Sequence, residues 1–336
     1  MEHQMKGRPG PEDLDPARFP EAGDPRQRLL FLLRYAVLAP SAYNAQPWRF
    51  RVTEDAVEIH ADPERWLALA DPQRRDLHIS LGCALENLRL AAARFGYWQA
   101  VRYFPEPEHS TLAAVLALGP GGPAEPGDET LFQAIPVRHT SHVVFDGRVP
   151  SREHLERLQA CDEHADLSLD LLDGAAAVPV VEELAVRADT MVFHDPQRRQ
   201  ELARVLGPEM LGRGWLRSRL GRWVLRHLDV GRSVAGADLR RLSGAPVIGV
   251  IAARPGSPEQ QLRVGQLFER LALTATGLGL RVQPLSALLG FPELVQDLRE
   301  LLPAGSGAPQ HVFRLGYGDP EVRSSPRRPV ADVLLD

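Results

Sequence analysis

Two distant segments of the chain carry the same helical pattern, and this repeat limits the folds that the chain can adopt. Residues 80–97 read SLGCALENLRLAAARFGY, and residues 263–280 read RVGQLFERLALTATGLGL. Apolar residues three and four positions apart predict two helices with broad buried faces, each ending near a glycine. Aligned without gaps, the segments share Gly82/Gly265, Glu86/Glu269, Leu88/Leu271, Leu90/Leu273, Ala92/Ala275 and Gly96/Gly279.

We interpret the repeat as an internal duplication, although chance similarity between two helices rich in Ala and Leu is the alternative. Strand-like runs at residues 111–118 and 311–315 follow the two helices and favour duplication. We expect the first half at residues 25–119, a connector rich in Gly and Pro at 120–129, and the second half at 130–336. Further strands are expected at residues 48–52, 57–61, 101–104, 167–172 and 245–253. The run that begins at residue 311 is expected to extend to 317. Helices packed on sheets then give a mixed α+β fold.

Composition excludes several classes of protein. The chain has 336 residues, of which 44% are apolar, enough for a sizeable core in one large or two ordinary domains. Its net charge of −5 is opposite in sign to a nucleic-acid footprint. No apolar run approaches the roughly 18 residues of a membrane span. Residues 1–24 lack the apolar core of a secretory signal and are rich in Pro, Gly and charge, so we expect a mobile tail there.

Reactive residues narrow the chemistry further. Cys83 and Cys161 form no CxxC pair, which fits reduced thiols in a cytoplasmic protein and offers no metal cluster. Lys6 is the only lysine and lies in the tail, so neither a buried Schiff-base lysine nor a P-loop can be built. The chain contains no GxSxG or HExxH, which leaves serine and zinc hydrolases without support.

Residues 38–50, LAPSAYNAQPWRF, join an apolar helical run to a strand. Between them, Pro40 and the polar Ser41, Asn44 and Gln46 break the helix and offer donors and acceptors. Such a loop suits the edge of a planar polar ligand, although an ordinary connection is the alternative.

Two arginine-containing segments are candidates for a phosphate site. Arg138, Thr140 and His142 alternate in the run RHTSH, so an extended chain places them on one side. Two cationic groups beside a hydroxyl could hold phosphate. Arg327 and Arg328 lie in the run SPRRP, near the C-terminal end of the sequence. In both segments, simply solvated side chains are the alternative.

These segments, in this order, resemble the nitroreductase-like flavoprotein superfamily, and most of all its Acg-type branch. The loop at 40–48 is similar to the PSxxNxQPW segment, RHTSH to the RxSxR/K segment and PRRP to the closing basic motif. Gln283, Pro284 and Leu285 stand where the family has a P-[IL]-E-G loop beside the flavin, with Ser286 in place of Glu. Arg240 stands near a family lysine.

The resemblance implies a nitroreductase-like fold of mainly antiparallel sheets flanked by helices, with two pseudo-symmetric halves in one chain. In the family, FMN lies between two subunits. Here the two halves would supply one complete site, so that a monomer would suffice, and an insertion at residues 186–242 would cover the flavin. NAD(P)H would reduce FMN, which would then reduce a nitroaromatic, a quinone or a similar small acceptor, with no catalytic side chain.

Departures from the family pattern lead to specific expectations for charge near the flavin and for the pH dependence of flavin binding. His142 replaces a permanent cation, so flavin binding should weaken as pH rises through the pKa of this histidine, which nearby negative charge would place above about 6.5. His142 and Arg240 are the candidates for positive charge near the flavin pyrimidine edge. A flavin-storing or redox-sensing protein with a closed pocket is the alternative function.

Overall fold

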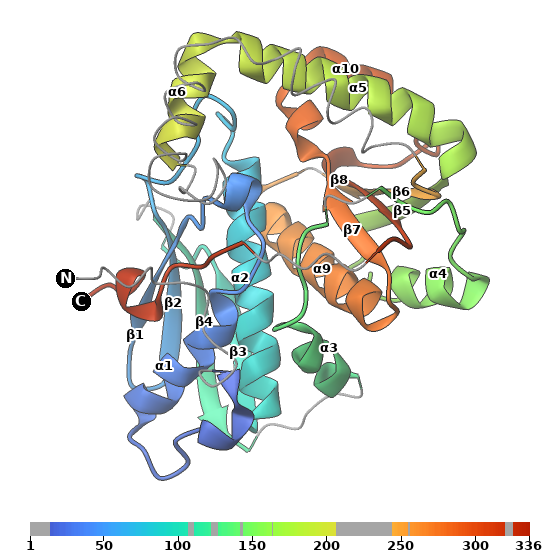
Figure 1. The fold of residues 1–336 in the computed structure, drawn as a ribbon. Coiled ribbons are helices and arrows are strands. Elements are labelled where there is room, and N and C mark those ends of the chain that lie inside the picture. The colour runs from blue at the N-terminus through green and yellow to red at the C-terminus, as the bar shows by residue number, and fades with distance from the viewer. Residues whose placement is uncertain are drawn as a thin grey trace, which may run out of the picture.

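The computed structural model describes residues 14–106, 111–121, 127–141, 144–162, 164–205, 244–254, 256–319 and 325–336. Two four-stranded sheets stand on either side of a pair of crossing helices, α2 and α9 (Figure 1). The first half contains α1 (Pro25–Ala36), β1 (Trp48–Val52), β2 (Ala56–Ala61), α2 (Arg75–Arg94), β3 (Tyr97–Tyr103) and β4 (Leu112–Pro120). Helix α3 (Asp128–Ala134) leads to α4 (Arg152–Gln159), β5 (Leu167–Asp173), α5 (Gly174–His194), α6 (Pro196–Val205), β6 (Val247–Ala253), α9 (Pro258–Gly277), β7 (Arg281–Pro284), α10 (Pro292–Arg299) and β8 (Ala308–Gly316).

The two sheets repeat one topology. Their strand orders are β1-β2-β4-β3 and β5-β6-β8-β7, and all neighbouring pairs within them are antiparallel. Each sheet also carries a register shift in the corresponding pair, between Ile59 and His60 in β2 and between Ile251 and Ala252 in β6. The mixed fold of two related halves is therefore confirmed.

The expected strands are confirmed, with boundaries that differ by up to four residues. One strand was missed. Gln283 and Pro284, expected in a loop, lie in β7, which pairs with β8. Proline and a length of only four residues hide this strand from sequence patterns, because proline is rare within sheets.

Helices α2 and α9 cross where their glycines meet. A Cβ atom on Gly82 would lie 2.0 Å from the carbonyl oxygen of Leu262, and one on Gly265 would lie 2.1 Å from the carbonyl oxygen of Ile79. The backbones therefore touch directly. This contact explains why both copies of the repeat carry glycine at the same position.

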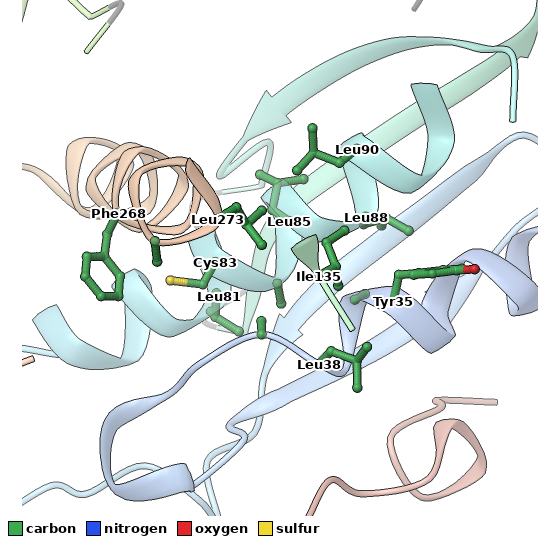
Figure 2. Packing of buried hydrophobic residues seen from close by; sticks show 14 of the residues in the cluster. Tyr35, Leu38, Leu81, Cys83, Leu85, Leu88, Leu90, Ile135, Phe268 and Leu273 are labelled. Carbon is green, nitrogen blue, oxygen red and sulfur yellow. The ribbon is translucent and has the colours of Figure 1, made fainter. Parts of the chain in front are cut away.

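Apolar side chains on the two helices fill the core around this crossing. Figure 2 shows Leu81 and Leu85 of α2 close to Phe268 and Leu273 of α9. Helix α9 begins at a capping box in which Ser257 and Gln260 exchange hydrogen bonds. Burial of one broad face and a fixed start thus set the position of this helix.

Three expected boundaries change. A mobile tail up to residue 24 is wrong for residues 14–24, because Leu14 is buried and Phe19 stacks on Phe95 with ring centroids 4.2 Å apart. The connector at 120–129 overlaps the end of β4 and the start of α3. The insertion expected at 186–242 begins inside α5, and its residues 206–242 lie outside the described residues.

None of the described helices combines the length and the apolar character that crossing a bilayer requires.

The glycine contact gives a stability prediction. Gly82→Ala and Gly265→Ala should each destabilise the protein by about 1–3 kcal/mol or more, because the added methyl group must push two backbones apart. Gly277→Ala is the matched control, since its Cβ would lie 3.8 Å from the Thr130 side chain. It should be neutral or stabilising by up to about 1 kcal/mol. Urea unfolding measures all three, and unchanged midpoints for the first two would contradict close helix contact.

Candidate functional site

The loop between α1 and β1 has an unusual backbone. Tyr43, Asn44 and Gln46 have φ angles of 50°, 53° and 51°, in the left-handed region that side chains normally avoid. Ser41 Oγ accepts the Gln46 backbone N–H at 2.9 Å, and Ser80 Oγ accepts that of Ala42 at 3.3 Å. Strained residues of this kind persist only where the surroundings hold them, and they cluster at functional sites.

The C-terminal segment returns from the second half to the first. It lies beside β1 (Figure 1). The Phe50 N–H donates to the Val333 carbonyl at 2.8 Å, and the Leu335 N–H donates to the Phe50 carbonyl at 2.7 Å. This pairing covers the edge of the first sheet and brings Arg327 and Arg328 to the loop of residues 38–46.

Asn44 and Gln46 hold this segment in place. Asn44 Nδ2 donates to the Pro326 carbonyl at 3.2 Å, and its Oδ1 accepts from Arg327 at 3.1 Å. Gln46 Oε1 accepts the Arg328 backbone N–H at 2.7 Å. The two amides were expected to face a ligand. In this structure they instead fix the segment that carries the arginines.

The two C-terminal arginines have different surroundings. Arg328 donates to a carboxylate oxygen of Asp62 at 3.3 Å and to the Asp332 carbonyl at 2.6 Å, so its charge is used within the fold. Arg327 points inward and donates from Nε and Nη2 to the Leu38 carbonyl oxygen, at 3.4 and 3.2 Å. Arg327 is therefore the better candidate for binding an anion.

Arg138 meets Arg327 at the same carbonyl. It follows α3, is 3% exposed, and donates from Nη2 to the Leu38 oxygen at 3.2 Å. Two buried guanidinium groups thus meet at one carbonyl oxygen, while Arg327 Nη1 also donates to Asn44 Oδ1 and to the Ser325 and Pro326 carbonyls, and Arg138 also faces Glu269. Ser141, three residues further along the chain, is buried, and its hydroxyl has no hydrogen-bond partner among the described residues. Two buried guanidinium groups at one point fit a phosphate group, which accepts several charge-assisted hydrogen bonds.

Thr140 and Pro284 line a small hollow beside Arg138, together with Phe268 and Val282. Its volume of about 10 Å³ has room for one water molecule at most. This hollow is therefore too small for a flavin ring. His142 and Arg240 lie outside the described residues.

The sequence analysis did not identify Arg314 as a buried charged residue of this region. It lies in the middle of β8, is 1% exposed, and stacks on Phe145 with its guanidinium carbon 4.6 Å from the ring centre. Its Nε donates to Gln283 Oε1 at 2.9 Å. The signal for Arg314 in the sequence was a charged residue inside the apolar run HVFRLGYG.

Leu285, another expected neighbour of the flavin, follows β7, and its N–H donates to the Val312 carbonyl at 2.7 Å.

The paired glutamates of the repeat differ sharply in their surroundings. Glu86 is fully buried and accepts from Arg270 at 2.8 Å, from Gln266 at 3.0 Å and from Arg89 at 3.1 Å. Burial alone would raise the pKa of Glu86, but Arg89, Arg270 and these hydrogen bonds outweigh it and lower that pKa.

Glu269 is equally buried but much more weakly bonded: neither of its oxygens has a partner of good geometry among the described residues, and Asn87 of α2 is the one side chain whose hydrogen bonding lowers its pKa. Its closest cation is Arg138, whose Nε lies 3.4 Å from Oε1. Burial raises the pKa of Glu269 to about 7, although Arg138 and Arg327 partly oppose this shift.

A bridge of helices joins the halves above this site. Helices α5 and α6 run over the top of the molecule in Figure 1. The Glu201 carboxylate in α6 accepts the backbone N–H groups of Leu69 and Ala70, at 2.9 to 3.1 Å. Arg204 donates to the Trp66 carbonyl at 3.4 Å. The bridge is thereby fixed to the first half.

The two glutamates should give opposite dependences of stability on pH. Between pH 4.5 and about 7 the folded protein keeps a proton on Glu269 that the unfolded chain has lost. Stability from this group therefore falls by roughly 3 kcal/mol as pH rises through that range. Glu86, with its lowered pKa, contributes stability that is lost as pH falls below about 4.5.

Urea unfolding of Glu269→Gln, Glu86→Gln and the natural protein from about pH 3 to 8 measures this difference. Relative to the natural protein, Glu269→Gln should gain stability as pH rises from about 4.5 to 7, whereas Glu86→Gln should lose stability as pH rises toward about 4.5. Slopes of the same sign in both variants would contradict the assignment.

Comparison with known proteins identifies sequence relatives. No family model matches the chain. It is 27% identical over 358 residues to the putative NAD(P)H nitroreductase Rv3131 of Mycobacterium tuberculosis, covering 97% of this chain and 94% of that protein. It is 25% identical over 316 residues to the putative NAD(P)H nitroreductase acg of the same species, covering 90% and 93%.

Solved structures that match part or most of the chain include a putative nitroreductase from Anabaena variabilis, with a TM-score of 0.46, 12% identity and 91% of each chain covered. Another is the FMN-dependent nitroreductase NfnB from Mycobacterium smegmatis, with a TM-score of 0.38, 20% identity, and coverage of 57% of this chain and 88% of that one. These sequence relationships extend over nearly the whole length of both proteins, and they support the resemblance of this chain to the nitroreductase-like superfamily, with Acg-type homologues.

Proposed function

We propose that this chain is an FMN-dependent oxidoreductase of the nitroreductase type, which uses NAD(P)H to reduce a small acceptor such as a nitroaromatic or a quinone. The observation that carries the proposal is the convergence of buried Arg138 and Arg327 on the single carbonyl oxygen of Leu38. A phosphate monoester offers several charged oxygens to such donors. Relatives over the whole length are named NAD(P)H nitroreductases, which supports the same function.

Each group has a proposed part in binding. Arg138, Arg327 and the Ser141 hydroxyl hold the phosphate, with Thr140 beside them. Asn44 and Gln46 keep the segment of Arg327 in position. The bound flavin supplies the two-electron chemistry, and no side chain serves as a nucleophile. Gln283, Pro284 and Leu285 remain proposed neighbours of the ring, together with Pro40 and Ser41.

The two halves, at residues 25–119 and 130–336, act in this proposal as the two subunits of a family dimer. Residues 40–46 come from the first half, and Arg138 and Arg327 come from the second. A monomer would thus contain one complete site.

A flavin-storing or redox-sensing protein is the second candidate. Two observations favour it. The hollow beside Thr140 has a volume of only about 10 Å³, and Glu201 fixes the α5–α6 bridge to the first half. A pocket closed in this way would hold a flavin with little access for an acceptor.

Removing either buried arginine should weaken flavin binding. Truncating a buried, charge-assisted contact costs roughly 2–5 kcal/mol, or about 30-fold or more in affinity. Arg138→Ala and Arg327→Ala should show this loss in FMN titrations followed by fluorescence. Arg152→Ala is the control for loss of one charge, because Arg152 is exposed. The natural protein should release about one FMN per chain on denaturation. Two per chain, FAD, or equal affinity in all variants would contradict the site.

The absorption spectrum separates the two candidate functions. A reductase should be yellow, lose its flavin absorption when NADH or NADPH is added under nitrogen, and regain it with a nitroaromatic or a quinone. A storage protein should keep its absorption in both steps. A colourless protein that takes up no FMN would contradict both.

A further inference from the structure

We infer that Glu269 is the internal counter-ion of Arg138, and that a phosphate-bearing ligand displaces it from this role by driving its protonation. Binding of the anion is then coupled to uptake of one proton from solvent. The inference rests on the proposed function, since FMN is the ligand that brings the phosphate.

The argument begins with the broken symmetry of the two helices. Residues of α2 and α9 correspond with an offset of 183, as Gly82 does to Gly265. Glu86 accepts hydrogen bonds from Gln266 and Arg270 of α9 and from Arg89 of α2. The equivalent residues around Glu269 are Cys83, Asn87 and Ala272. None of these three carries a positive charge, and together they offer fewer hydrogen-bond donors than the partners of Glu86.

Glu269 has therefore kept the carboxyl group of the repeat, but on the helix pair it has Asn87 and Ala272 in place of the two arginines that stabilise the charge of Glu86. A structural carboxylate would be bonded as Glu86 is, because an ionised buried group without hydrogen bonds is costly. Instead, Glu269 depends on Arg138, which is also the arginine aimed at the proposed phosphate site. One guanidinium group is shared by an internal carboxylate and an external anion.

The charges that face Glu269 determine the sign of the coupling. Arg138 faces it from the segment after α3, Arg327 from the C-terminal segment, and Glu86 and Cys83 from α2. A phosphate dianion beside Arg138 and Arg327 offsets both positive charges. The Glu269 carboxylate then loses the positive charge that stabilised its ionised form, so its pKa rises above the ligand-free value of about 7.

The consequence for affinity follows from linkage. A ligand that raises the pKa of a carboxyl group binds its protonated form more tightly. Affinity should be constant below about pH 7 and should fall by up to about tenfold per pH unit above it, until the pKa of the complex is reached. Proton uptake should be small at pH 6.5 and should approach one per FMN above about pH 7.5.

Two measurements on the natural protein test the coupling directly. FMN affinity is measured by fluorescence from pH 6.5 to 8.5, where the phosphate is mainly a dianion. Calorimetry in two buffers of different ionisation enthalpy counts the protons taken up. Affinity that does not vary with pH, or proton release on binding, would overturn the inference.

Two variants locate the proton. Glu269→Gln mimics the protonated carboxyl group, so its affinity should be independent of pH and should match the natural protein at pH 6.5. Glu86→Gln is the control at the symmetry-related position and should keep the slope of the natural protein. If Glu269→Gln keeps the slope, the proton is bound elsewhere, for example at His142 as the sequence predicts, and the inference fails. Near-UV circular dichroism confirms that each variant is folded.

Sulfate separates failure of this inference from failure of the proposed function. It is a dianion throughout this pH range. Sulfate should raise the melting temperature of the natural protein more at pH 6.5 than at pH 8.5, and this difference should vanish in Glu269→Gln. If sulfate behaves so but no FMN binds, the proposed function alone is wrong. If FMN binds but neither ligand responds to Glu269→Gln, the coupling alone is wrong.

Discussion

The direct contact between Gly82 and Gly265 fixes the geometry on which the rest of this structure depends. With no side chain at either position, the backbones of α2 and α9 meet, and each helix then presents the residue one turn further on to its partner. Those residues are Glu86 and Glu269. The same crossing sets the two sheets on opposite sides of the helix pair, so that the segments linking the halves must pass across the crossing (Figure 1).

The crossing segments create the candidate site. The chain leaving the first half brings Arg138 inward after α3, and the C-terminal segment, returning to pair with β1, brings Arg327. Both meet at Leu38, where α1 has ended and its last carbonyl groups are not used by the helix. A polar site thus forms between two apolar halves, because helix ends and crossing segments are the places where backbone groups and charges remain available.

The two halves share one scaffold, whereas the polar residues between α2 and α9 differ from one half to the other. Both copies keep the strand order, the register shift and the helix pair, since these features determine packing. The polar residues between the helices are free to differ. Around Glu86 they form a satisfied network, which adds rigidity. Around Glu269 they leave a carboxyl group whose charge depends on arginines from outside the helix pair, and this makes one side of a symmetric core responsive to a ligand.

The sequence by itself determined the repeated helices, seven of the eight described strands and the segments that carry the candidate site, because apolar periodicity and short polar motifs are local properties. It could not reveal β7, which is too short and contains proline, nor the packing of residues 14–24, which depends on the distant Phe95. Only the tertiary structure decided which arginine turns inward, since Arg327 and Arg328 are neighbours in the same motif and differ only in what lies opposite them. It also decided that Asn44 and Gln46 bind the returning C-terminal segment, and that two glutamates at equivalent positions of a repeat have opposite electrostatics. Hydrogen bonding and desolvation are set by groups hundreds of residues away, and no local pattern records them.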